Sequence, residues 1–125
     1  MSAARRTILV VDDTPESIMV LCALLKGTYD TKVAINGEAA LRVLAATAVD
    51  LVLLDVMMPG LDGYETCRRI RATPRLARLP VVFLSAKDAP EDIARALAAG
   101  GSTVLAKPVE PARLQAVLER WVGQA

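Results

Sequence analysis

Four short apolar runs in this chain each end in polar residues. Asp12 and Asp13 follow residues 8–11, Asp55 follows 51–54, Ser85 follows 81–84, and Lys107 follows 104–106. Short continuous apolar runs suit strands that are buried on both faces, as in a parallel sheet. The carboxyl ends of parallel strands meet at one edge of the sheet, and ligands bind beyond that edge. The pattern therefore predicts that these polar side chains lie together.

Helical stretches separate the apolar runs and complete an α/β pattern of (βα)5 type. Right-handed crossovers between the strands give a doubly wound five-stranded parallel sheet, with the flavodoxin-like strand order 2-1-3-4-5. The first and last helices then cover one face of the sheet, and the middle three cover the other. The expected strands lie near residues 7–12, 31–35, 50–55, 80–85 and 103–106, and the expected helices at 15–26, 37–47, 63–72, 90–99 and 111–122.

The ends of the first helix carry recognisable signals. Thr14 or Asp13 can cap its N-terminus, and Pro15 suits its first turn. Gly27 suits the position just past its end, where a left-handed backbone is common.

Size and charge bound the class of protein. The 125 residues fit one domain, 1–125, with an ordered core at about 6–122. A net charge of +1 creates no general attraction for nucleic acid or membranes, so we expect neither as a direct partner. We interpret the arginines between residues 68 and 78 as a solvated helix face and loop. No apolar run is long enough to span a membrane, and no signal peptide precedes the first strand, so we expect a cytoplasmic protein.

Histidine and cysteine content narrows the chemistry. The chain has no histidine, which excludes a histidine-based catalytic triad, and its two cysteines are too few for an ordinary zinc site. The expected fold places Cys22 and Cys67 on opposite faces of the sheet, too far apart for a disulfide.

The three aspartates predict a cation site. Clustered carboxylates repel one another unless they are protonated or bound to a cation, and Mg²⁺ is a natural partner for oxygen ligands. A hydroxyl from Ser85 and an ammonium from Lys107 beside that metal suit a phosphoryl group. Taken singly, Asp12 and Asp13 could be helix caps, Ser85 a turn former and Lys107 a solvated loop residue.

These residues together resemble the receiver domain of two-component response regulators. The resemblance rests on the Asp12–Asp13 pair, the segment 55–63 (Asp-Val-Met-Met-Pro-Gly-Leu-Asp-Gly), Ser85–Ala86 and Lys107–Pro108, and it covers nearly the whole chain. It implies that Asp55 is a phosphoacceptor that takes a phosphoryl group from the phosphohistidine of a sensor histidine kinase or histidine phosphotransfer protein. The phosphorylated domain then acts on a downstream effector, as a switch rather than as an enzyme that turns over a substrate.

The resemblance also implies a role for each site residue. Asp13 and Asp55 would bind Mg²⁺ directly, Asp12 would act through water, and Met57 would contribute its backbone carbonyl. Ser85 and Lys107 would contact the phosphoryl oxygens. Val104 stands where many receivers carry an aromatic residue that moves on activation.

The first helix has more apolar residues than one buried face needs. Met19, Val20 and Leu24 lie off the predicted core stripe. Neighbouring side chains could cover them, or they could form a patch for the phosphodonor, which receivers meet partly through this helix.

Three other functions compete with this interpretation. An aspartate-nucleophile phosphatase needs a second acidic residue two positions after the nucleophile. That position holds Met57 if Asp55 is the nucleophile and Pro15 if it is Asp13, so neither matches. A flavin-binding module would want a hydroxyl- and glycine-rich loop after the first strand, where this chain has acidic residues that repel phosphate. A pseudo-receiver that acts only as a binding surface would not need the intact acidic site.

Overall fold

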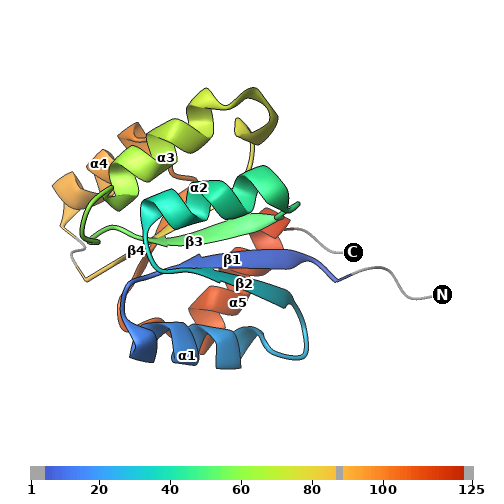
Figure 1. Cartoon of the computed structure of the whole chain (residues 1–125). Helices are drawn as coiled ribbons and strands as arrows, with labels where there is room; N and C mark the ends of the chain where they lie inside the picture. The colour runs from blue at the N-terminus through green and yellow to red at the C-terminus, as the bar shows by residue number, and fades with distance from the viewer. Residues whose placement is uncertain (1–4, 87–88, 123–125) are drawn as a thin grey trace.

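The computed structural model describes residues 5–86 and 89–122. Five parallel strands form one sheet in the order β2-β1-β3-β4-β5, as expected, and helices follow the strands along the chain (Figure 1). The strands are β1 (Thr7–Val11), β2 (Asp30–Ala34), β3 (Leu51–Asp55), β4 (Val81–Ser85) and β5 (Thr103–Ala106). The helices are α1 (Pro15–Leu25), α2 (Gly37–Ala46), α3 (Gly63–Ala72), α4 (Pro90–Ala98) and α5 (Pro111–Val122), with a 3-10 turn at Pro74–Leu76.

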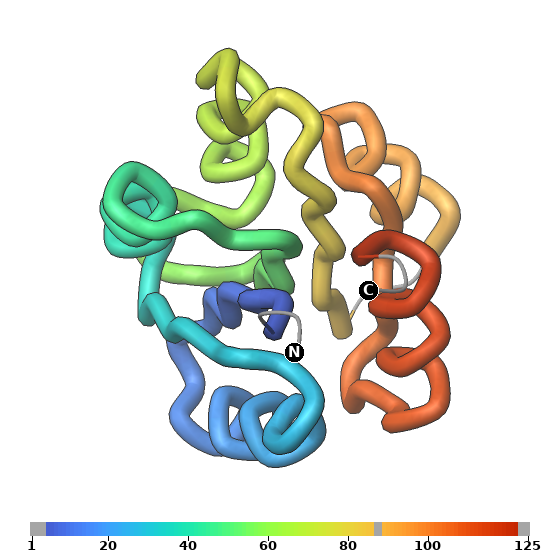
Figure 2. The backbone as a smooth tube through the Cα atoms, turned by 90° about the vertical axis from the view of Figure 1, so that its right-hand side faces the viewer, coloured from blue at the N-terminus to red at the C-terminus, as the bar shows by residue number. Residues whose placement is uncertain are grey.

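The helices cover the sheet in two layers, as the strand order predicts. In Figure 1, α1 and α5 lie on one side of the sheet, while α2, α3 and α4 lie on the other; Figure 2 shows the same layers from a second direction. Alternate residues of each strand point to opposite faces of the sheet, so that Leu9 and Val11 pack in one core while Ile8 and Val10 pack in the other. All residues of β3 and β4 are buried, because both faces of these central strands are covered.

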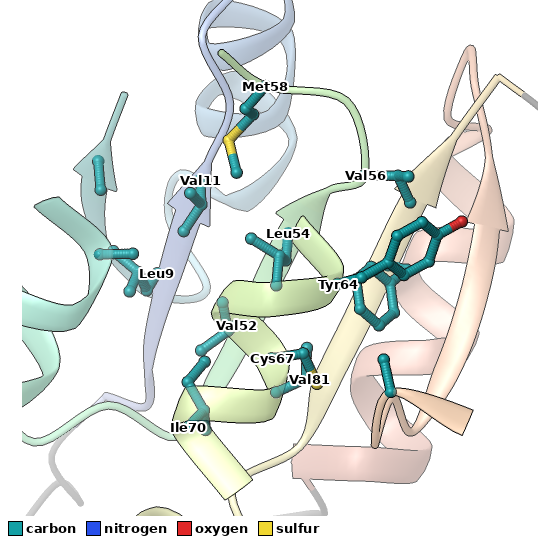
Figure 3. Close-up of a cluster of buried hydrophobic side chains, with 14 of the residues drawn as sticks. Leu9, Val11, Val52, Leu54, Val56, Met58, Tyr64, Cys67, Ile70 and Val81 are labelled. Atoms are coloured by element: carbon teal, nitrogen blue, oxygen red, sulfur yellow. The ribbon is translucent and has the colours of Figure 1, made fainter. Parts of the chain in front are cut away.

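The core beneath α2, α3 and α4 is the larger of the two (Figure 3). Its strand residues include Val52 and Leu54, and α3 contributes Tyr64, Cys67 and Ile70. Cys67 is fully buried here, whereas Cys22 lies on α1 across the sheet, and both thiols are free. The prediction that the two cysteines do not pair is confirmed.

The expected cap of α1 is only partly right. Thr14 occupies the N-cap position, but its side chain makes no capping hydrogen bond, and the expected cap from Asp13 is not formed either. Instead, the Asp12 carboxylate accepts a hydrogen bond from the backbone N–H of Thr14 at 2.9 Å. At the other end, Gly27 has φ +90, which confirms the expected left-handed turn.

Two of the arginines near α3 also make structural hydrogen bonds, which the interpretation from sequence as a solvated face and loop did not include. Arg71 donates hydrogen bonds to the carbonyls of Gly100 and Leu79 at 2.8 and 2.6 Å. Arg75 donates to the carbonyl of Leu44 at 2.6 Å. These contacts connect the end of α3 to neighbouring loops and helices.

Within the described part of the chain, none of the helices combines the length and the apolar character that a membrane crossing requires.

Candidate functional site

Four strand ends bring the predicted site residues to one edge of the sheet. Asp12 directly follows β1, Asp55 and Ser85 are the last residues of β3 and β4, and Lys107 directly follows β5. Because β1 and β3 are neighbours in the sheet, the two loops that follow them start side by side. Asp12 is fully buried, Asp55 and Ser85 are 6% exposed, and Asp13 is exposed.

Lys107 joins the two buried carboxylates. Its Nζ lies 3.0 Å from Asp12 Oδ2 and 3.1 Å from Asp55 Oδ2. The other oxygen of Asp55 accepts a long hydrogen bond from the backbone N–H of Met57 at 3.4 Å. The ammonium therefore balances charge that burial would otherwise make costly.

Burial and the ion pairs move the pKa values of this pair. Burial is the main cause that raises the pKa of Asp55 above its ordinary value; Lys107 opposes this change, and the nearby Asp12 adds to it. Burial alone would lower the pKa of Lys107, but its hydrogen bonds with Asp12 and Asp55 outweigh that effect, so the net change is upward. Lys107 thus stays charged at neutral pH.

The three aspartates offer a ligand set that fits a hard divalent cation. One carboxylate oxygen from each of Asp12, Asp13 and Asp55 lies within 4.8 Å of the others. These oxygen ligands suit Mg²⁺, because this ion keeps several of its waters when bound and the exposed Asp13 leaves the site open to water. The donor chemistry and the spacing agree with the cofactor predicted from the sequence.

The loop between β3 and α3 borders the acidic cluster. The side chain of Met57 points outward and is 67% exposed, while Met58 is buried in the larger core. Gly60 turns the loop with φ +76. Asp62 ends the loop and caps α3, because its side chain accepts a hydrogen bond from the N–H of Glu65 at 2.8 Å.

An apolar groove that the sequence did not reveal begins beside the site. A cavity of about 450 Å³ lies between α1 and the loop from β5 to α5. Its lining residues are Glu16, Ser17, Val20, Leu21, Leu84, Ala86, Lys107, Pro108 and Val109. A smaller hollow of about 240 Å³ lies between Leu24 and the α5 residues around Leu114. Sequence reasoning missed the groove because it depends on how two helices pack, although the surplus apolar residues of α1 were a signal.

Fold and site together define a class: doubly wound α/β domains with an acidic, lysine-paired site at the point where the strand order reverses. The family model for the response regulator receiver domain matches residues 8–119. This chain therefore belongs to the response regulator receiver domain family of two-component signalling.

Curated relatives agree with that assignment. Response regulator PleD from Caulobacter vibrioides is 39% identical over 108 residues, which are 86% of this chain and 24% of PleD. DNA-binding response regulator MtrA from Mycolicibacterium smegmatis is 38% identical over 125 residues, covering 96% of this chain and 54% of MtrA. The chain thus spans about a quarter to a half of the length of these relatives.

Solved structures show the same fold. The receiver domain of a sensor histidine kinase from Pseudomonas aeruginosa is 36% identical, covers 97% of this chain and 100% of its own, and superposes with a TM-score of 0.89; it holds a magnesium ion in its active-site cleft. The chemotaxis protein CheY4 of Vibrio cholerae is 27% identical, covers 94% of this chain and 99% of its own, and has a TM-score of 0.89.

Proposed function

We propose that Asp55 is the phosphoacceptor of this receiver domain and that Mg²⁺ supports its phosphorylation. The observation that carries the proposal is the placement of Lys107, whose ammonium reaches the carboxylates of both Asp12 and Asp55. A lysine fixed between a buried carboxylate and a candidate nucleophile is placed to pair with the oxygens of an incoming phosphoryl group.

The reaction is a transfer between a nitrogen and an oxygen. A carboxylate oxygen of Asp55 attacks the phosphorus of a phosphohistidine, so that an O–P bond forms and the N–P bond breaks. The electron pair of the broken bond stays on the imidazole nitrogen of the donor. Asp55 is 6% exposed at the carboxyl end of β3, so the donor would reach it from that edge of the sheet, while its burial holds the nucleophile in place.

The remaining site residues bind and orient. Asp13 and Asp55 would bind Mg²⁺ directly, and Asp12 would bind it through water. The Met57 backbone carbonyl would be the remaining protein ligand. When bound, the metal would neutralise charge on the phosphoryl oxygens. Ser85, at the end of the strand next to Asp55, would donate its hydroxyl to a phosphoryl oxygen.

The groove along α1 supports a docking role for the phosphodonor. Met19 and Val20 are 70% and 55% exposed, so neighbouring side chains do not cover them. Val20 lines the groove that begins at Lys107, which connects the apolar surface to the site. The partner is a sensor histidine kinase or a histidine phosphotransfer protein in the cytoplasm, and a downstream effector protein or domain reads the phosphorylated state. The chain thus acts as a switch rather than as a turnover enzyme.

A charge placed in the groove separates docking from chemistry. Val20→Lys should slow phosphotransfer from a phosphorylated histidine kinase at least tenfold, while phosphorylation by acetyl phosphate stays within twofold of the parent. Leu97→Lys, on the 48% exposed Leu97 of α4, is the matched control and should leave both rates unchanged. Equal transfer rates for the parent and Val20→Lys would contradict docking through this groove.

A further inference from the structure

Gly63 leaves no room for a side chain beside the backbone of the proposed phosphoacceptor. It is the first residue of α3, and a Cβ atom on it would lie 2.4 Å from the carbonyl oxygen of Asp55 and 2.9 Å from the Cα of Val56. Both distances are shorter than a real Cβ contact allows, and backbone atoms cannot rotate away as the end of a flexible side chain can. The backbone of Gly63 has no positive φ, so the contact, rather than the conformation, requires glycine.

The backbone of Val56, which directly follows the proposed phosphoacceptor, is held from two sides. On one side, the N–H of Val56 donates to the carbonyl of Leu84 on β4 at 3.1 Å. On the other, the carbonyl of Val56 accepts the N–H of Gly63 at 3.1 Å. Figure 3 shows Val56 and Met58 beyond the end of the strand, with the helix that carries Tyr64 and Cys67 lying over the same face of the sheet. The first turn of α3 therefore packs directly against the start of the loop between β3 and α3.

We propose that Gly63 is a positioning residue, which acts by letting α3 rest directly on the Asp55–Val56 peptide. This contact fixes where the loop leaves β3, and so fixes the Met57 carbonyl that would bind Mg²⁺. The inference rests on the proposed function, because it needs the metal site described above. Gly60, in the same loop, has nothing within 4 Å of its Cβ position, so close approach is specific to Gly63 there.

A methyl group at this position would move the loop or the helix by about 1 Å, which is enough to lower the efficiency of a site by about a hundredfold. Mg²⁺ is sensitive to such a change because it requires nearly ideal octahedral geometry. Alanine is also a better helix former than glycine, so a loss in Gly63→Ala cannot come from helix propensity.

The test compares Gly63→Ala with Gly101→Ala. A Cβ on Gly101 would meet the Phe83 ring at 2.6 Å, so this variant also disturbs a tight glycine, but it does not touch the backbone of Asp55 or Val56. Mg²⁺ affinity is measured by calorimetry on folded protein, and labelling by acetyl phosphate is followed by intact mass. Gly63→Ala should raise the Mg²⁺ dissociation constant at least tenfold and should slow labelling. Gly101→Ala should keep the Mg²⁺ dissociation constant within twofold of the parent, even if its unfolding temperature falls as much as that of Gly63→Ala. A Gly63→Ala protein that melts lower but binds Mg²⁺ like the parent would overturn the inference.

A second pair of variants covers the case in which Gly63→Ala does not fold. Asp62→Ala removes the cap that fastens the first turn of α3, while Asp62→Asn removes the charge but keeps an acceptor for the N–H of Glu65. Asp62→Ala should bind Mg²⁺ severalfold more weakly than Asp62→Asn, and equal affinities would overturn the inference. A parent protein that does not bind Mg²⁺ at all would overturn the proposed site and this inference together.

Discussion

At the scale of single residues, Lys107 is the part of the site on which the metal-free fold depends most. Its side chain is 22% exposed and contacts two carboxylates, one of which is fully buried. Removing one partner of a buried ion pair leaves a charge without compensation, and this is more costly than the net contribution of the intact pair. The same position would serve a phosphoryl group once one is present.

Lys107→Ala should therefore lower the free energy of unfolding by about 2 kcal/mol in the presence of a chelator. Mg²⁺ should restore part of this loss, because a bound cation again compensates the carboxylates and stabilises the folded state by mass action. Urea unfolding with and without Mg²⁺ measures both effects. Lys32→Ala, on an exposed lysine of β2, should stay within about 0.5 kcal/mol of the parent. A loss that Mg²⁺ does not change would argue against a cation site beside Lys107.

Asp13→Asn should have the opposite effect on the metal-free protein. Removing one of three neighbouring carboxylates relieves repulsion, so stability in chelator should rise by about 1 kcal/mol or less, since Asp13 is exposed and water screens its charge. Mg²⁺ affinity should fall in the same variant. A less stable Asp13→Asn protein in chelator would show that Asp13 supports the start of α1 instead.

Met57 should control how long the phosphoryl group lasts. Its backbone N–H contacts the Asp55 carboxylate, and its exposed apolar side chain at this position can hinder an attacking water. Met57→Asn should speed autodephosphorylation severalfold, measured by loss of the labelled mass after the donor is removed. Met19→Asn is a matched control, because Met19 is 70% exposed but lies on α1, and it should not change the rate. An unchanged rate in Met57→Asn would place the control of water access elsewhere.

At the scale of elements, the switch cannot depend on a swinging aromatic residue of β5. Val104 is partly buried opposite Phe83 and is β-branched, so its side chain has little freedom. Rings are present instead on β4 and α3, where the Tyr64 and Phe83 centroids lie 5.6 Å apart. The guanidinium of Arg95 on α4 lies 4.5 Å from the centre of the Tyr64 ring, which connects α4 to α3.

We expect phosphorylation to change the conformation mainly between Ser85 and the first turns of α4. A phosphate mimic such as beryllofluoride with Mg²⁺ should shift the amide resonances of residues 86, 89 and 91–95, with small changes at Val104 and in α5. Residues 87 and 88 lie outside the described part of the chain. Shifts spread over α5 with none at the start of α4 would contradict this route.

At the scale of the whole molecule, the sequence was enough to predict the sheet, its order and every strand and helix to within a residue at each end. It succeeded because the central strands are continuously apolar and because Gly27 and Pro15 mark the ends of α1. Contacts between elements were not predictable in the same way. The missing side-chain cap at Thr14, the Arg71 hydrogen bonds, the groove along α1 and the close approach of Gly63 all depend on how helices and loops pack in three dimensions.

The most direct test of the account is the phosphorylation of Asp55 itself. The full chain is incubated with acetyl phosphate and Mg²⁺, and intact and peptide masses are recorded, with Asp55→Asn and a chelator-treated sample as controls. The account predicts a single phosphoryl adduct on the peptide that contains Asp55, lost in Asp55→Asn and absent with the chelator. Equal labelling of the parent and of Asp55→Asn, or no labelling of the parent in Mg²⁺, would contradict it.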